Sequence, residues 1–149
     1  MALKLPLEEL QRVQEVLNKI ELMRPLGLDE VREMAFQLTR RSFKRDDVII
    51  KQGSEGRHFF FIYRGRVKVI KEKMFGKVEL AELGPGDFFG EMSLIDGTRR
   101  SATVVGHEPG EMYTLPHDAF RAVLMANNSV RQMILDVHEA RKRGSIGRG

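Results

Sequence analysis

One stretch of sequence organises this chain: Gly84-Pro85-Gly86-Asp87-Phe88-Phe89-Gly90-Glu91-Met92-Ser93-Leu94, followed shortly by Thr98-Arg99-Arg100-Ser101-Ala102-Thr103. Three glycines within seven positions let the backbone adopt positive φ angles and approach a ligand closely. The segment after Gly90 is long enough for one or two helical turns that end at Gly97. The first free N–H groups of these turns would point together toward an anion. An arginine from the following predicted strand offers a rigid fork of donors that suits a phosphate, whereas an ionised Glu91 only accepts hydrogen bonds and suits sugar hydroxyls. The stretch therefore predicts a pocket for a ribose phosphate.

The string FGEMSLIDGTRRSATV resembles the phosphate-binding cassette of cyclic nucleotide-binding domains, which regulate cyclic-nucleotide-dependent kinases, certain ion channels and bacterial transcription activators. The resemblance runs from about Ile20 to Arg143 and includes two framework glycine sites, Gly53-Ser54-Glu55-Gly56 and Gly65. It implies a mainly β fold with flanking α-helices (α+β). The expected architecture is an eight-stranded double-sheet β-roll, or jelly roll, with N-terminal helices and a C-terminal lid helix.

The resemblance also assigns binding roles within the cassette. Arg100 lies nine residues after Glu91, as in the kinase members, and would pair with an exocyclic phosphate oxygen. Glu91 would accept a hydrogen bond from the ribose 2′-hydroxyl, and the Ser101 hydroxyl could add a donor. Neighbouring residues on a strand face opposite sides, so Arg99 is expected at the surface. Further backbone N–H donors are expected from Gly90, Glu91, Met92, Ser93 and Ser101.

Recognition of the base is less sharply defined by the sequence. Val78 and Leu80, on the strand before the cassette, would line one side of the purine. In the family a residue of the last helix closes over the base, and the candidates are Arg141, Lys142 or Arg143; an arginine plane could stack on the purine. The alternative is a solvated basic helix end that complements the helix dipole. A serine at position 101, where cGMP-preferring members tend to have threonine, favours cAMP over cGMP.

Composition narrows the classes of protein that fit. The 149 residues suffice for one domain, and a hydrophobic content of 42% supports a packed core. There is no cysteine, which excludes disulfides and thiolate metal sites. The net charge of +4 arises mostly from mixed-sign surface charges, so it does not by itself indicate nucleic-acid binding. No apolar run reaches the length of a membrane span and no signal-peptide core begins the chain, so we expect a cytoplasmic protein with no transmembrane segment.

Periodicity divides the one domain into three segments. Residues 1–40 are expected to be helical, with helices from Leu7 to about Met23 and from Leu28, the latter capped by Asp29. Residues 41–116 are expected to form the β-roll, with the cassette at 84–103, and residues 117–143 the C-terminal helices. Tight turns or loops are expected at three places inside the roll, namely Arg64-Gly65, Met74-Phe75-Gly76 and 106–110.

Other functions fit the sequence less well than a sensor. A cupin-like enzyme or small-molecule or metal-binding protein would need clustered ligands, but the histidines are scattered, so we expect no catalytic residue, no metal and no cofactor besides the cyclic nucleotide. A transcription regulator would carry a helix-turn-helix after the last helix. The few residues after Arg143 leave no room for one, so no sequence-specific nucleic-acid binding is expected. A structural module that has lost its ligand would show a damaged cassette, whereas Gly90, Glu91 and Arg100 are present. A cGMP-binding regulatory domain of a channel or kinase stays open as the alternative.

The predicted function is a cyclic nucleotide-binding sensor domain, with cAMP as the favoured ligand. Phosphate capture would draw the cassette inward, and the helix after Asn128 would swing over the base. The expected partners are the nucleotide and either an unidentified downstream protein or a missing effector domain. An apolar stripe could also serve a homodimer or simply pack on its own domain; it comprises Leu10, Val13, Leu17 and Ile20.

Overall fold

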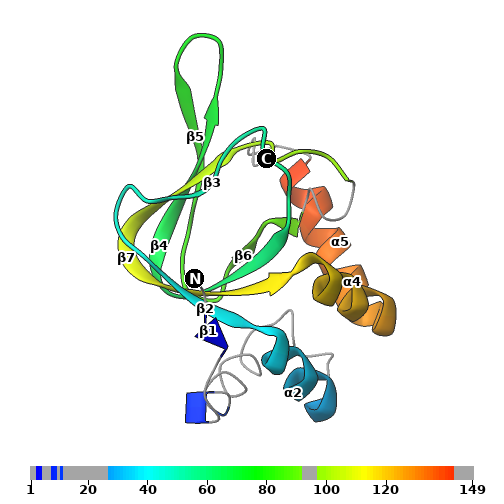
Figure 1. Ribbon diagram of the computed structural model, residues 1–149. Helices are drawn as coiled ribbons and strands as arrows, with labels where there is room; N and C mark the ends of the chain where they lie inside the picture. The colour runs from blue at the N-terminus through cyan, green and yellow to red at the C-terminus, as the bar shows by residue number, and fades with distance from the viewer. Residues whose placement is uncertain (1–2, 5–7, 10, 12–26, 92–96, 143–149) are drawn as a thin grey trace.

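The computed structural model describes residues 3–4, 8–9, 11, 27–91 and 97–142 (Figure 1). The strands are β1 (Leu3–Lys4), β2 (Thr39–Phe43), β3 (Val48–Ile50), β4 (His58–Glu72), β5 (Lys77–Leu83), β6 (Phe88–Phe89) and β7 (Thr103–Pro116). The helices are α2 (Leu28–Gln37), α4 (His117–Ala126) and α5 (Asn128–Lys142). Within these ranges, none of the helices is long and apolar enough to cross a membrane.

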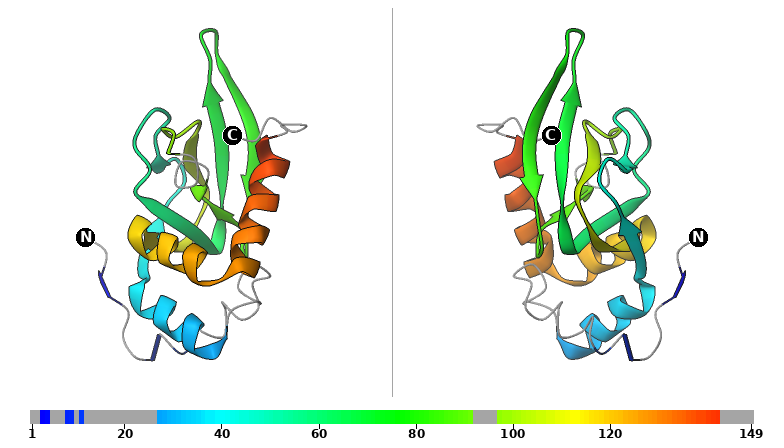
Figure 2. Two further views of the ribbon diagram at one scale, coloured as in Figure 1. Left: turned by 90° about the vertical axis from the view of Figure 1, so that its right-hand side faces the viewer. Right: turned by 90° about the vertical axis from the view of Figure 1, so that its left-hand side faces the viewer.

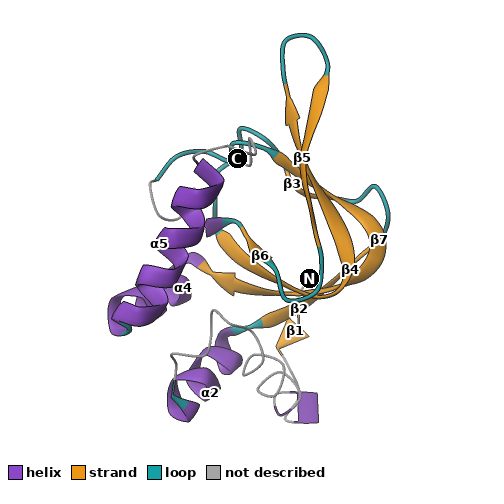
Figure 3. Cartoon of the chain, turned by 180° about the vertical axis from the view of Figure 1, so that it is seen from behind, coloured by secondary structure: helices purple, strands orange, loops and turns teal. Residues whose placement is uncertain are grey.

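The described strands form one antiparallel sheet that curls into a roll, with the helices on one side (Figure 3). Its main order is β1-β2-β7-β4-β5, while β3 pairs with β7 and β6 pairs with β4. The two longest strands, β4 and β7, pair along most of their length and form the spine of the roll. The mainly β architecture with flanking helices is as predicted, and the eight strands implied by the resemblance stay a prediction.

The predicted turn at Arg64-Gly65 and the predicted loop at 106–110 are wrong. Both segments lie inside the continuous strands β4 and β7, where the pairing register shifts. Gly65 has a φ of +85°, and a Cβ on it would lie 2.7 Å from the Cα of Gly110. The two glycines thus let the spine strands bend and cross closely instead of turning back, which local sequence does not reveal.

Alternation along β4 separates two apolar cores. Phe60 and Ile62 face the interior of the roll, together with residues such as Val67, Val69, Ala81, Leu83, Phe89 and Val104. Phe59 and Phe61 face the helices, where the ring of Phe59 stacks on Phe120 of α4 with 4.3 Å between centroids. The same core takes Val130 and Ile134 from α5, so the C-terminal helix is held to the roll by apolar contacts.

The helices confirm most of what periodicity indicated. Helix α2 begins at Leu28 as expected, but Asp29 is not its cap. Gly27 occupies the N-cap, and its N–H donates to Glu30 Oε1 at 3.0 Å. The last helix begins near Asn128 as expected, and Asn127 caps it because Asn127 Oδ1 accepts from Val130 N at 3.0 Å.

Strand β3 is buried at Ile49 and Ile50, whereas Val48 at its start is 55% exposed. The predicted helix from Leu7 to Met23 falls largely outside the described residues. The whole apolar stripe lies outside them, as do residues 92–96, where the helical turns after Gly90 were expected.

Candidate functional site

The backbone of Arg100 is clamped by the loop that follows β3. Gly53 N donates to Arg100 O and Arg100 N donates to Ser54 O, both at 2.8 Å. Gly53 adopts a φ of +87°, which a side chain would disfavour. Arg100 therefore lies in an irregular segment just before β7 rather than on a strand, which corrects the sequence prediction.

The side chain of Arg100 points into the protein and is only 7% exposed. Its Nη1 donates to Gly90 O and its Nη2 donates to His58 O, each at 2.7 Å. Gly90 has a φ of +92°, and a Cβ on it would lie 2.9 Å from His58 O. A glycine is therefore required where the cassette begins, because the backbone must pass directly over β4 and Arg100.

Electrostatics at this site favour an anion. Burial lowers the pKa of Arg100 below its usual value, and the negative charge of Glu91 opposes that lowering. Burial also lowers the pKa of His58, and the positive charges of Arg100, Arg41 and Arg57 lower it further. The arginine charges that add to this effect at His58 would also attract a phosphate.

Glu91 lies next to this cation and is 2% exposed, so the structure brings Glu91 and Arg100 together. Arg99 points the other way: its side chain is exposed and donates to Gly53 O at 3.2 Å. Ser101 is exposed as well. The ligand-binding roles assigned to these residues stay predictions, while the opposite orientation of Arg99 and Arg100 is what the sequence indicated.

The residues predicted to contact the base are placed only in part. Leu80 lies on β5 where its pairing with β4 shifts register, opposite Val69 and Ile70. Its side chain packs against the interior core of the roll. Val78 is 40% exposed on the same strand. Arg141 and Lys142 lie in the last turn of α5, but their side chains are outside what the structure describes, as are Met92, Ser93 and Arg143.

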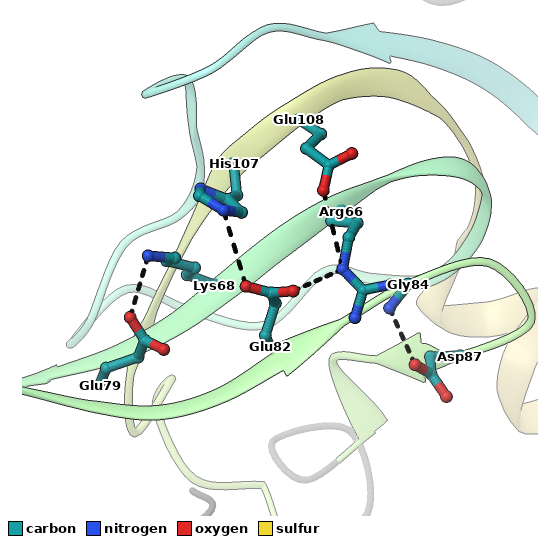
Figure 4. Close-up of polar contacts among 8 residues, drawn as sticks. All are labelled: Arg66, Lys68, Glu79, Glu82, Gly84, Asp87, His107 and Glu108. Atoms are coloured by element: carbon teal, nitrogen blue, oxygen red, sulfur yellow. Dashed lines mark hydrogen bonds and ion pairs between the residues drawn. The ribbon is translucent and has the colours of Figure 1, made fainter.

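An outward-facing charge network holds the turn that leads into the cassette (Figure 4). Arg66 Nε contacts Glu82 Oε2 at 2.5 Å, and this hydrogen bond holds the pKa of Glu82 below its usual value. His107 Nε2 lies 3.7 Å from the other Glu82 oxygen. Gly84 packs against the Arg66 guanidinium, and its N–H donates to Asp87 Oδ2 at 2.9 Å. Exposed ion pairs add little stability, so the network's main effect is to position this turn.

A groove of about 420 Å³ lies elsewhere, between α2 and α4. It is lined by the carboxylates Glu30, Glu33 and Asp118 and by apolar residues that include Met34 and Ala119. With carboxylates and no basic side chain among the residues that line it, the groove does not suit a phosphate. Nor does any group of three potential metal ligands occur among the described residues.

Sequence reasoning missed His58 and Ser54 as parts of the site. Both act through backbone carbonyls that accept from Arg100, and His58 lies 42 residues from it in sequence. A carbonyl is present at every position, so no residue type could have indicated these contacts.

Comparison with known proteins gives a consistent result. A family model described as the cyclic nucleotide-binding domain matches residues 40–127. The chain is 32% identical to a cGMP-dependent protein kinase of Caenorhabditis elegans over 78% of this chain and 15% of the kinase. It is 31% identical to the cAMP-dependent protein kinase regulatory subunit of Debaryomyces hansenii over 74% of this chain and 24% of that protein. The chain thus spans less than a quarter of the length of either relative.

A solved structure shares the fold. The regulatory domain of Toxoplasma gondii PKA, crystallised with cAMP, superposes with a TM-score of 0.83. The similarity covers 89% of this chain and 51% of that one, at 21% sequence identity. The superposition shows that the two proteins share the β-roll fold.

Proposed function

We propose that this chain, which belongs to the cyclic nucleotide-binding domain family, is a cAMP-binding sensor domain with no catalysis of its own. One observation carries the proposal. Glu91 and Arg100 are both buried at the start and end of the cassette and lie within electrostatic reach of each other.

The phosphate would bind at Arg100. The Arg100 guanidinium presents a rigid fork of N–H donors that suits a phosphate, and its described bonds include those to the carbonyls of Gly90 and His58. Burying this cation is unfavourable, and the single negative charge of a cyclic phosphate would offset that cost. Backbone N–H groups of Gly90, Glu91, Met92, Ser93 and Ser101 would supply further donors.

The sugar and base would bind on either side of this point. Glu91 would accept from the ribose 2′-hydroxyl, which distinguishes a ribonucleotide from a deoxyribonucleotide. Val78 and Leu80 would contact the purine, and Arg141 would stack on it from α5. Ser101 favours cAMP. Since the relatives include a cGMP-dependent kinase as well as a cAMP-dependent regulatory subunit, cGMP is the alternative ligand.

The output would be a movement of α5. This helix begins at a separate cap on Asn127 and is held by Val130 and Ile134, so it can pivot there without unfolding the roll. The ligand would drive closure only through higher affinity for the closed state. We infer that closure regulates a partner protein or a further domain in the cytoplasm, because the relatives are kinases and kinase regulatory subunits.

Isothermal titration with cAMP, cGMP, 2′-deoxy-cAMP and 5′-AMP tests the binding. We expect cAMP to bind more tightly than cGMP, and both analogues to bind at least tenfold more weakly than cAMP. Equal affinity for 2′-deoxy-cAMP would exclude the role of Glu91. No binding of any cyclic nucleotide would refute the proposed function.

Hydrogen exchange of residues 129–143 with and without cAMP tests the closure. Added protection of this helix in the complex supports a lid. Identical exchange in both states would exclude it, even where titration shows that the nucleotide binds.

A further inference from the structure

The hairpin of β4 and β5 projects well beyond the roll (Figure 2). At its tip Met74 is 90% exposed and Phe75 is 92% exposed. They are the most exposed large hydrophobic side chains among the described residues. Adjacent apolar side chains that are exposed together and flanked by charged residues are typical of an interaction surface.

The hairpin is held in place up to its last strand pair. Glu72 pairs with Lys77 across the two strands, and the tip is closed by Lys73 N donating to Gly76 O at 2.9 Å. The side-chain amide of Gln52 braces the end of β4, because Gln52 Oε1 accepts from Glu72 N at 2.8 Å and Gln52 Nε2 donates to Glu72 O at 3.1 Å. The apolar tip is therefore presented on a fixed support.

Positive charge surrounds this tip. Residues 71–77 contain three lysines and one glutamate. Glu72 lies 3.9 Å from Lys77 Nζ, and lower on the hairpin Glu79 pairs with Lys68. Within the described part of the chain, Lys71 and Lys73 show no ion pair, so their charges are available to an external anion.

We propose that this tip inserts into the surface of a bilayer that contains anionic phospholipids. Met74 and Phe75 would enter the boundary between headgroups and acyl chains, while Lys71 and Lys73 would contact the lipid phosphates. The combination of apolar tip and flanking lysines matches both chemistries of that surface. The inference concerns a different part of the molecule from the nucleotide site and does not depend on it.

The size of the tip favours a lipid surface over a protein partner. A stable protein interface buries about 800 Å² on each partner, from some 20–30 residues. Two side chains on a narrow hairpin cannot supply that area alone. Membrane association needs only a few buried apolar groups and a few basic residues, which the tip provides.

The absence of tryptophan from the chain allows a direct test. Phe75→Trp places a single fluorophore at the tip, and Phe36→Trp places one on α2, at the opposite end of the molecule (Figure 1), where Phe36 is 53% exposed. The full chain is titrated with phosphatidylcholine vesicles that contain phosphatidylserine, and with phosphatidylcholine vesicles alone. We expect a blue shift only for Phe75→Trp and only with phosphatidylserine.

Vesicle co-sedimentation of tryptophan-free variants provides the affinities. Phe75→Ser should weaken binding by about tenfold to a hundredfold, as expected for losing one buried aromatic side chain. Lys71→Gln and Lys73→Gln should each weaken it by about fivefold. Phe36→Ser, the matched control, should bind as the unaltered chain does.

Three results would overturn the proposal. The first is no blue shift of Phe75→Trp on any vesicle, or an equal shift on neutral vesicles. The second is undiminished vesicle binding by Phe75→Ser, which would show adsorption of a basic protein without insertion. The third is a blue shift that grows with protein concentration in the absence of lipid, which would identify a second copy of the chain as the occupant.

Discussion

Replacing Arg100 with glutamine tests whether Arg100 binds the nucleotide phosphate or has only a structural role. The side chain is 7% exposed, so a phosphate bound there would be largely shielded from water. Removing one partner of a buried, hydrogen-bonded charge pair costs about 2–5 kcal/mol of binding free energy. At 1.4 kcal/mol per tenfold, Arg100→Gln should raise the Kd for cAMP by about 30-fold to several thousandfold.

The same substitution also affects folding, and this has to be measured alongside. Arg100 donates two charge-assisted hydrogen bonds, to Gly90 O and His58 O, of which each contributes about 1.5–3 kcal/mol. Relief of the desolvated charge offsets part of that loss. We expect Arg100→Gln to remain folded with a lower Tm, and Arg100→Lys to retain more affinity because it keeps the charge but loses the fork.

Arg99→Gln is the matched control, with the same change one residue earlier. Arg99 is exposed and makes one described bond, to Gly53 O, so its replacement should alter the Kd by no more than about twofold. Isothermal titration with cAMP supplies the affinities, and thermal unfolding by circular dichroism shows that each variant is folded. A folded Arg100→Gln with unaltered affinity would refute the reasoning, as would a larger loss in Arg99→Gln.

Three further predictions concern folding and pH. Gly110→Ala places a Cβ against the backbone of Arg64 and should lower the free energy of unfolding by about 3 kcal/mol or more. Gly86 has a φ of +89° with open space around it, so Gly86→Ala should lower the free energy of unfolding by only about 1 kcal/mol. Equal losses for the two variants in denaturant unfolding would contradict this. The pKa of His58 is lowered from 6.5 in the folded chain, so the unfolded chain takes up a proton on His58 at a higher pH. The free energy of unfolding should therefore fall as the pH drops below about 6.5. His58→Gln should remove this fall from the pH profile of the free energy of unfolding. Burial and the charges of Glu9 and Glu111 raise the pKa of Tyr113 to about 12, so Tyr113 ionises near pH 10 in the unfolded chain but not in the folded one. The free energy of unfolding should therefore decline between pH 10 and about pH 12. The same alkaline decline in Tyr113→Phe would show that Tyr113 is not its cause.

Much of this protein could be derived from residue patterns alone. The helices at α2, α4 and α5 followed from apolar spacing and from the break at Asn127, and the turn at Met74-Phe75-Gly76 followed from its glycine. Alternation predicted strands, because a half-buried strand must place successive side chains on opposite faces. The cassette could be located because its glycines, acid and arginine are chemically unusual side-chain choices at a short spacing.

What joins those segments was decided by tertiary structure. Gly65 read as a turn, yet it faces Gly110 across the two long strands and lets them bend together, because a close approach of two backbones depends on a partner far along the chain. The fixing of Arg100 likewise depends on carbonyls of His58 and Gly90, which carry no signature in sequence. Side-chain chemistry and periodicity are local and can be read directly, whereas backbone hydrogen bonds and steric fit between distant segments exist only once the chain has folded.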